Sequence, residues 1–440
     1  MTTTNSKLTR LASILPFLLL LPLFTKAEDC IVPHNNDGSD DSPAILSSFT
    51  QCSINSTITF EQAEYQALTP ISLVGLENVT IFLNGNIHLP TNISQVQHAI
   101  NTTTNQPSTY ATPWFYIHGS NVQIIGSDDS GWGRFDGHGE QWWNQGNRIL
   151  RPQLATFNVT NGLLRNLKVI KPIAWDGTSQ NHFVDAKPDN GTRDVTTMGR
   201  FPSARHPRPS LTFNSYYGHN GDDCISVING ARDVVVQNGF CGFSSHGLSI
   251  GSLGRDGAEQ TVANVLFKNW TMEGAVYGAR FKSWTGGRGW AENVTWEDIK
   301  LVNVSTGIFI TQKSDKGPRP DNPGHASTRI SNFKYKNFSG TLSSNWTDGT
   351  CISNPCWNYI QGIDNTRAII FDLYPGTAVN VSVEDVDVQT SNGASSQVIC
   401  DPSALASGEQ ASLGFKCATG PLMELDEGGK GKGKWGSDIQ

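Results

Sequence analysis

The 440-residue chain has almost no helical periodicity and little that would divide it into domains. Apolar residues seldom recur at the three- and four-residue spacing of an amphipathic helix, which argues against a helical protein. Linkers rich in Pro, Ser and Gly or in one charge are missing before residue 428. We therefore expect one domain over residues 28–427, followed by a flexible tail, residues 428–440, that is poor in hydrophobic side chains.

Long apolar runs are also scarce, and the one that stands out lies near the N-terminus. Lys7 and Arg10 precede a leucine-rich run from Leu11 to Phe24, and Ala27 offers a small residue for cleavage. This order is typical of a secretory signal peptide, residues 1–27. The run is shorter than the ~20 residues of a membrane-spanning helix. We expect a secreted, extracellular protein with no membrane partner.

Basic residues are fewer than acidic ones, 32 against 39, so the net charge is −7. Removal of residues 1–27 takes away Lys7, Arg10 and Lys26 and no acidic residue, which brings the net charge to −10. Such a protein is a poor partner for nucleic acid, whose phosphates demand a basic surface. An acidic polysaccharide would also be repelled at long range, so it would have to be held by a few local cations.

Cys-x-x-Cys spacing and Cys/His clusters are absent, which argues against a zinc site, and we expect neither metal nor cofactor. The eight cysteines form four sequence-local pairs, and after a signal peptide the default interpretation is disulfides, although eight cysteines allow many connectivities. They are Cys30, Cys52, Cys224, Cys241, Cys351, Cys356, Cys400 and Cys417. Sequons are dense, so several surface asparagines should carry glycans. They are Asn55, Asn78, Asn92, Asn101, Asn158, Asn190, Asn269, Asn293, Asn303, Asn337, Asn345 and Asn380.

What the chain does contain is a degenerate repeat of short β-type segments, each closed by Asn, Asp or Gly. One series comprises residues 78–83, 121–126, 154–159, 233–238, 264–269 and 293–298. A second comprises residues 224–227, 247–250, 279–282 and 307–310, which start 23, 32 and 28 residues apart. Short strands at such spacing predict an all-β, single-domain parallel β-helix, a β-solenoid. The alternative is a large β-sandwich built from hairpins.

Polar side chains concentrate in three successive members of the second series. Asp222 and Asp223 lie next to Cys224, His246 lies one repeat later, and Arg280 and Lys282 lie one repeat after that. Arg280 and Lys282 are two residues apart and so share one face of a strand. Stacked on neighbouring coils, these groups suit hydrolysis of an acidic sugar chain. One carboxylic acid would protonate the leaving oxygen, one carboxylate would activate water, and the cations would hold the sugar carboxylate.

The segments Asn220–Cys224, Ser245–Ser252 and Arg280–Lys282 together resemble the signature segments of glycoside hydrolase family twenty-eight, the polygalacturonases and their relatives. The resemblance covers roughly residues 70–340. It implies a right-handed parallel β-helix, an inverting mechanism and no metal.

The same resemblance implies roles for individual residues. Asp222 corresponds to the general acid and Asp223 to one of two water-activating aspartates. His246 corresponds to the residue that tunes the acid's protonation. Arg280 and Lys282 correspond to substrate-carboxylate binders, and a disulfide between Cys224 and Cys241 lies beside the site.

The sequence around His246 and Lys282 resembles that of the exopolygalacturonases, which release single galacturonate units from the non-reducing end. The implied function is a secreted, monomeric galacturonan 1,4-α-galacturonidase that acts on pectic polysaccharide. Rhamnogalacturonan-directed exo-hydrolases share the same core and stay open as an alternative.

One segment departs from the family's pattern. The family carries a third aspartate in an Asn-Thr-Asp-Gly type segment about 20 residues before the Asp-Asp pair. Here residues 198–210 hold three arginines, three prolines and no carboxylate. Three explanations stay open: a frameshift or splice error in the recorded sequence, a real inactivating substitution, or replacement by Asp189 or Asp194. Without that aspartate we expect the chain to be inactive or severely impaired, which leaves a non-catalytic pectin-binding protein as a rival.

Two other enzyme classes share features with this sequence. Residues 247–251 match the G-x-S-x-G elbow of serine esterases, but that motif needs a following helix, and the sequence after residue 251 predicts none. A pectate lyase would share the solenoid but needs a calcium site and β-elimination chemistry.

Overall fold

The computed structural model describes residues 1, 28–103, 110–111, 113–143, 150–173, 211–219, 223–242, 245–314, 322–343, 367–390, 397–400, 424–425 and 431–432. The predicted signal peptide therefore lies outside the described residues except for Met1, and the predicted tail lies outside them except for residues 431–432. None of the helices in the described residues is long and apolar enough to cross a membrane.

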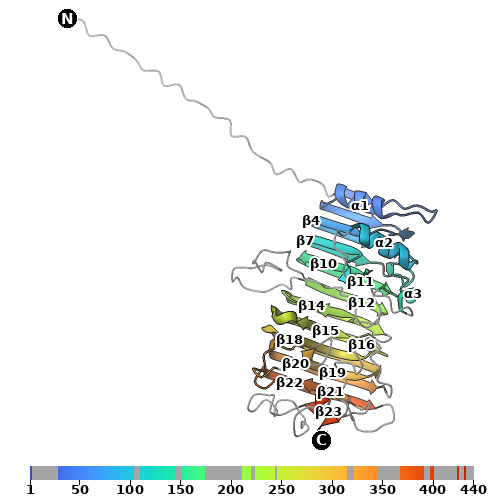
Figure 1. The fold of residues 1–440 in the computed structure, drawn as a ribbon. Coiled ribbons are helices and arrows are strands. Elements are labelled where there is room, and N and C mark those ends of the chain that lie inside the picture. The colour runs from blue at the N-terminus through green and yellow to red at the C-terminus, as the bar shows by residue number, and fades with distance from the viewer. Residues whose placement is uncertain are drawn as a thin grey trace.

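The larger of two parallel sheets extends from residue 28 to residue 390, whereas the smaller one begins at residue 225 and ends at residue 400 (Figure 1). The main path of the larger, 15-stranded sheet follows β1 (Glu28–Ile31), β2 (Ile54–Phe60), β4 (Ile71–Leu83), β7 (Phe115–Gly126), β11 (Gly162–Ile170), β12 (Leu211–His219), β14 (Arg232–Gly242), β16 (Glu259–Glu273), β18 (Arg288–Val304), β20 (Arg329–Leu342) and β22 (Ala378–Thr390). The 6-stranded sheet contains β13 (Ile225–Val227), β15 (Leu248–Leu253), β17 (Tyr277–Trp284), β19 (Thr306–Ser314), β21 (Arg367–Asp372) and β23 (Gln397–Cys400). Neighbours in each sheet come from successive coils, so the chain forms the right-handed parallel β-helix that the repeats and the family resemblance predict.

Shorter elements complete the coils. Four strands extend the larger sheet: β3 (Glu64–Gln66), β5 (Asn86–His88), β8 (Arg134–Asp136) and β10 (Ala155–Thr160). Two small pairs are β6 (Tyr110–Ala111) with β9 (Arg151–Pro152), and β24 (Glu424–Leu425) with β25 (Gly431–Lys432), the latter antiparallel. The helices are α1 (Ser42–Gln51), α2 (Ile93–Thr103), α3 (Glu140–Trp143) and the 3₁₀ turn η1 (Arg255–Gly257).

The second repeat series stacks in register as predicted, since Ile225 pairs with Leu248, Leu248 with Ala279, and Ala279 with Ile308. Five of the six segments in the first series also lie in equivalent strand positions. The exception is residues 154–159, most of which form β10 and pair with the first half of β7, residues 115–120. Their expected place is taken by the start of β11, where Leu163 pairs with Gln123. The error arose because consecutive β-type segments of one coil look alike in sequence.

Asparagines mark the bends between strands, as the repeat pattern suggested. Asn264, Asn293 and Asn332 have φ near +55°, a left-handed conformation that Asn tolerates better than other side chains with a Cβ. Asn293 Nδ2 donates to Asn264 Oδ1 at 3.0 Å, and Asn332 Nδ2 donates to Asn293 Oδ1 at 2.9 Å. Identical residues at equivalent positions of successive coils therefore form a hydrogen-bonded column on the surface, which fixes the register of the larger sheet.

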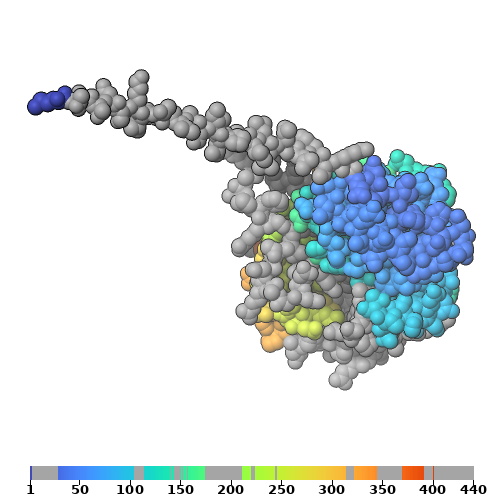
Figure 2. Space-filling view, turned by 90° about the horizontal axis from the view of Figure 1, so that it is seen from above, coloured from blue at the N-terminus to red at the C-terminus, as the bar shows by residue number. Residues whose placement is uncertain are grey.

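Stacked side chains fill the interior and a helix covers one end. Trp296 stacks on Phe267 at 5.3 Å and on Tyr335 at 4.7 Å, so three coils share one aromatic column. At the N-terminal end, α1 buries Ile45 and Phe49 against the first coils. Figure 2 looks onto this end and shows the blue residues spread across it. Such a cap covers the end of the first coil, which an open solenoid would leave exposed.

Candidate functional site

The smaller sheet brings four of the predicted site residues together. Asp223 lies two residues before β13, and His246 lies two residues before β15. Arg280 and Lys282 lie on β17, the next strand of the sheet. Ser226 of β13 pairs with Ser249, which in turn pairs with Arg280, so the three strands stack in the expected order. The sequence order of acid, histidine and cations is thus preserved in space.

Asp223 is the centre of the cluster and is completely buried. A terminal guanidinium nitrogen of Arg280 and the hydroxyl of Ser249 both donate to its Oδ1. The Lys282 ammonium lies 3.2 Å from its Oδ2. Both carboxylate oxygens are therefore held by charged or polar donors, as a buried charge requires.

The balance of these contacts keeps Asp223 ionised. Burial alone would raise its pKa, because an ionised carboxylate loses its hydration. The positive charges of Arg280 and then Lys282, with the hydrogen bond from Ser249, outweigh burial and hold the pKa of Asp223 well below its usual range. The carboxylate of Asp223 is consequently charged at neutral pH.

Arg280 orients the histidine as well as the aspartate. Its Nη2 lies 2.9 Å from His246 Nδ1. A guanidinium can only donate, so Nδ1 must carry a lone pair and the proton of a neutral His246 resides on Nε2. Arg280 Nε also donates to Ser249 at 3.1 Å, and the guanidinium lies over the Tyr277 ring at 4.9 Å. The arginine is fixed from several sides.

Both cations are buried, which bears on their predicted role. Arg280 is 1% exposed and Lys282 is 5% exposed, and both contact Asp223. Their interpretation as binders of a substrate carboxylate stays a prediction, and the structure adds a partner that the sequence did not predict. Asp222, the expected general acid, and residues 198–210, the departing window, lie outside the described residues.

A disulfide lies next to the cluster. Cys224, next to Asp223, is bonded to Cys241 near the end of β14, which confirms that predicted pair. Cys30 and Cys52 are also bonded, as sequential pairing predicts. Cys400 is disulfide-bonded too, while Cys351, Cys356 and Cys417 lie outside the described residues.

Ser249 is the residue that the sequence reasoning passed over. It lies inside the G-x-S-x-G match, yet it belongs to strand β15 and bonds to Asp223 and Arg280. Only the short 3₁₀ turn η1 and then strand β16 follow, so the esterase interpretation fails on its structural context. Its position in the repeat could have revealed it. Ser249 lies in the segment 247–250, between the segment that follows Asp223 and the segment that contains Arg280.

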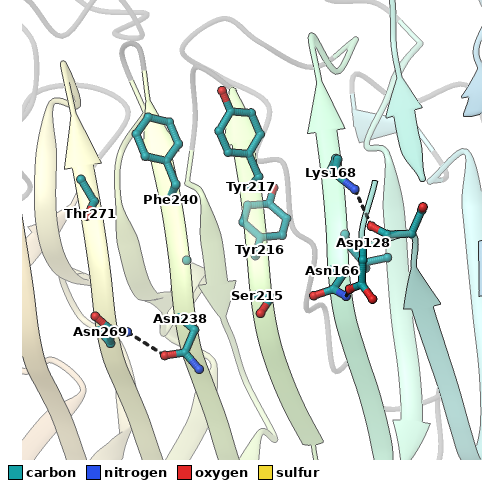
Figure 3. A pocket seen from close by; sticks show the side chains of 13 residues that line it. Asp128, Asn166, Lys168, Ser215, Tyr216, Tyr217, Asn238, Phe240, Asn269 and Thr271 are labelled. Atoms are coloured by element: carbon teal, nitrogen blue, oxygen red, sulfur yellow. Dashed lines mark hydrogen bonds between the residues drawn. The ribbon is translucent and has the colours of Figure 1, made fainter. Parts of the chain in front are cut away.

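A separate hollow of about 450 Å³ lies on the larger sheet, across β11, β12, β14 and β16. Figure 3 shows Tyr217 and Phe240 side by side on neighbouring strands, with Lys168 one strand further along. Their rings are parallel within 14° and 5.0 Å apart, and Tyr217 is 41% exposed. Lys168 Nζ donates to the carbonyls of Ser127 and Trp132, and burial followed by repulsion from Arg134 lowers its pKa. Aromatic rings beside amides and one cation are chemistry suited to a sugar chain.

Comparison with known proteins agrees with this geometry. Residues 210–366 match the family described as glycosyl hydrolases family 28. The chain is 33% identical to the "Probable exopolygalacturonase C" of Aspergillus terreus, over 94% of this chain and 98% of that protein. It is 26% identical to the "Exopolygalacturonase" of Cochliobolus carbonum, over 84% and 82% of the two chains. The crystal structure of endo-xylogalacturonan hydrolase from Aspergillus tubingensis shares the fold, with a TM-score of 0.58, 18% identity, and coverage of 89% of this chain and 99% of that one.

Proposed function

Because this chain belongs to the glycosyl hydrolases family 28, we propose that it is an exo-acting pectin hydrolase that cleaves α-1,4-galacturonosyl linkages and releases single galacturonate units. Its full-length relatives at 32–33% identity are named as exopolygalacturonases. The observation that carries the assignment is the buried Asp223 carboxylate, held between Arg280 and Lys282 with His246 alongside. An inverting glycosidase needs an ionised carboxylate that activates water and a second carboxylic acid that protonates the leaving oxygen.

In this proposal each residue of the cluster has one task. Asp222 gives its proton to the glycosidic oxygen as the bond to the anomeric carbon breaks. Asp223 accepts a proton from the water that attacks that carbon from the opposite face, which inverts its configuration. His246, whose Nδ1 accepts from Arg280, presents Nε2–H and so influences the proton on the acid. Arg280 and Lys282 keep Asp223 charged and place positive charge near the carboxylate of the bound galacturonate.

The surroundings of the protein follow from the same assignment. We place it outside the cell after removal of residues 1–27, as a monomer whose partner is pectic polysaccharide and neither nucleic acid nor membrane. Residues 28–427 form its catalytic domain and residues 428–440 its tail. Two complete disulfides among the described residues support an oxidising compartment. Mass spectrometry of the secreted protein would locate the new N-terminus and the glycosylated asparagines.

Product analysis on polygalacturonate tests the function. We expect monogalacturonate from the first time points, released with inverted anomeric configuration by NMR, and no ultraviolet absorbance from an unsaturated product. Oligogalacturonates with a rapid loss of viscosity would indicate endo action, and faster release from rhamnogalacturonan would favour that alternative substrate. Binding of polygalacturonate without any reducing-sugar release, even at high protein concentration, would leave a pectin-binding protein.

The hollow across β11, β12, β14 and β16 (Figure 3) provides a second contact for a long chain. Tyr217→Ala is expected to weaken binding of long polygalacturonate about 3- to 10-fold, since one aromatic contact contributes roughly 0.5–1.5 kcal/mol. Binding of a galacturonate trimer should not change, because the cluster lies on the other sheet. Val379→Ala, at an exposed valine of β22, is the matched control. Equal affinity of the Tyr217→Ala variant and the parent for long chains would contradict this prediction.

A further inference from the structure

Four titratable side chains form a continuous chain on the N-terminal coils, away from the cluster around Asp223. They come from β3, β5 and β8 of the larger sheet: Glu64, His88, Asp136 and, two residues after β8, His138. His88 Nδ1 lies 3.0 Å from His138 Nε2. The far nitrogens are also engaged, His88 Nε2 with Glu64 at 2.5 Å and His138 Nδ1 with Asp136 at 3.5 Å.

The carboxylates are themselves oriented. Asn86 Nδ2 donates to Glu64 Oε1 at 3.1 Å, which leaves Oε2 for His88. The backbone N–H of His138 donates to Asp136 Oδ1 at 3.0 Å. Each imidazole therefore has an outer carboxylate on one nitrogen and the other imidazole on its second nitrogen. This is the arrangement in which carboxylates position histidines that bind a metal.

We propose that His88 and His138 bind a divalent transition metal, with zinc as the reference ion, through the two nitrogens that face each other. One of these nitrogens carries the hydrogen and the other accepts the hydrogen bond, and the metal would take the place of that hydrogen. Tetrahedral zinc at about 2.0–2.1 Å from each ligand places two nitrogens about 3.3 Å apart. The present separation of 3.0 Å is close to this value, so only a small movement of the two rings is needed.

The site is open enough for an ion to enter and for water to complete the coordination. The side chains of His88 and His138 are 22% and 29% exposed. Imidazole suits zinc, copper and nickel, whereas calcium and magnesium prefer oxygen ligands. Among the described residues the other grouping of this kind contains Cys30 and Cys52, whose sulfurs form a disulfide and offer no thiolate.

Zinc titration of the tag-free, full-length secreted protein by calorimetry tests the site. We expect one equivalent of zinc to bind, and His88→Ala or His138→Ala to remove this binding. Glu64→Gln and Asp136→Asn keep both imidazoles and should weaken zinc binding about 10-fold, as loss of an outer carboxylate does in other zinc sites. His98→Ala, at an exposed histidine of α2, is the matched control and should bind like the parent.

The proposal does not depend on the proposed hydrolysis, so failure of one leaves the other standing. Should an alanine variant misfold by circular dichroism, Glu64→Gln, at a half-exposed surface residue, still decides the question. A parent protein that binds no zinc would overturn the proposal. So would zinc binding that is equal in the parent, His88→Ala and Glu64→Gln proteins.

Discussion

Placing Asn-Thr-Asp-Gly at residues 199–202 is expected to raise the rate of polygalacturonate hydrolysis by about 10²- to 10⁴-fold, the usual contribution of a positioned general base. The variant carries the changes Gly199→Asn, Arg200→Thr, Phe201→Asp and Pro202→Gly. It restores a carboxylate at the sequence spacing before Asp222 that the family resemblance implies. The expected increase presupposes that the parent chain turns over slowly for lack of this group.

The state of Asp223 explains why a second carboxylate matters. Arg280 and Lys282 hold its pKa well below the usual range, so its carboxylate is a weak base. A weak base is a poor proton acceptor, so general-base catalysis becomes less efficient as the pKa of the base falls far below the working pH. In the proposed mechanism Asp223 would therefore orient the attacking water, and a second carboxylate would share its proton. The third aspartate would supply it.

The same replacement with asparagine in place of the new aspartate is the matched control, because it differs from the aspartate variant only in the charge. We expect it to stay at the parent rate, measured by reducing-sugar release under saturating substrate. If the aspartate and asparagine variants are equally slow, the missing carboxylate is not what limits this chain. If the parent already turns over at the rate of the aspartate variant, residues 198–210 do not impair it, and the present account of the site is wrong.

The repeat pattern predicted the solenoid because each coil must bury the same face against its neighbours. The four segments that carry β13, β15, β17 and β19 were correctly placed, since their flanking residues and spacing are distinctive. Residues 154–159 were misplaced by one position in the coil, because β10 and β11 have the same apolar alternation. Local alternation identifies a strand, whereas its place in the coil depends on bends that only neighbouring coils fix.

The site could be predicted to the extent that its residues share recognisable segments. Asp223, His246, Arg280 and Lys282 were found because three segments occur in order at coil spacing. The ion pairs from Arg280 and Lys282 to Asp223 were not foreseen, because sequence spacing does not tell which carboxylate a buried cation meets. The histidine pair was missed altogether, since His88 and His138 are separated by 50 residues and belong to no motif.

Arg280→Met is expected to lower the free energy of unfolding by about 3–5 kcal/mol, the usual cost of removing one partner of a buried ion pair. The variant leaves the carboxylate of Asp223 buried with Lys282 as its remaining cation. Urea unfolding followed by tryptophan fluorescence would measure the loss. Arg288→Met, at the exposed first residue of β18, removes one exposed hydrogen bond to the carbonyl of Gly257 and should change stability by no more than about 1 kcal/mol.

The loss should depend on pH in a defined direction. The pKa of Asp223 is lower in the folded protein than its unfolded value of about 3.9. Its contribution to stability is therefore complete above the unfolded pKa and is lost as the pH falls through the folded pKa. Arg280 is the strongest of the influences that lower this pKa. In the Arg280→Met protein the folded pKa of Asp223 rises toward the unfolded value, so less stability is lost on acidification. The difference in the free energy of unfolding between the parent and the variant should therefore shrink as the pH falls below about 4.

A double variant separates the ion pair from simple loss of packing. Arg280→Met combined with Asp223→Asn removes both charges, so no uncompensated carboxylate stays buried. If the charge pair is what matters, the double variant should lose less stability than the sum of the two single losses, with a coupling energy within the roughly 0.5–3 kcal/mol seen for contacting residues. If the two changes simply add, Arg280 stabilises the coil through its contacts with Tyr277 and Ser249 instead. Its link to the ionisation of Asp223 would then be disproved.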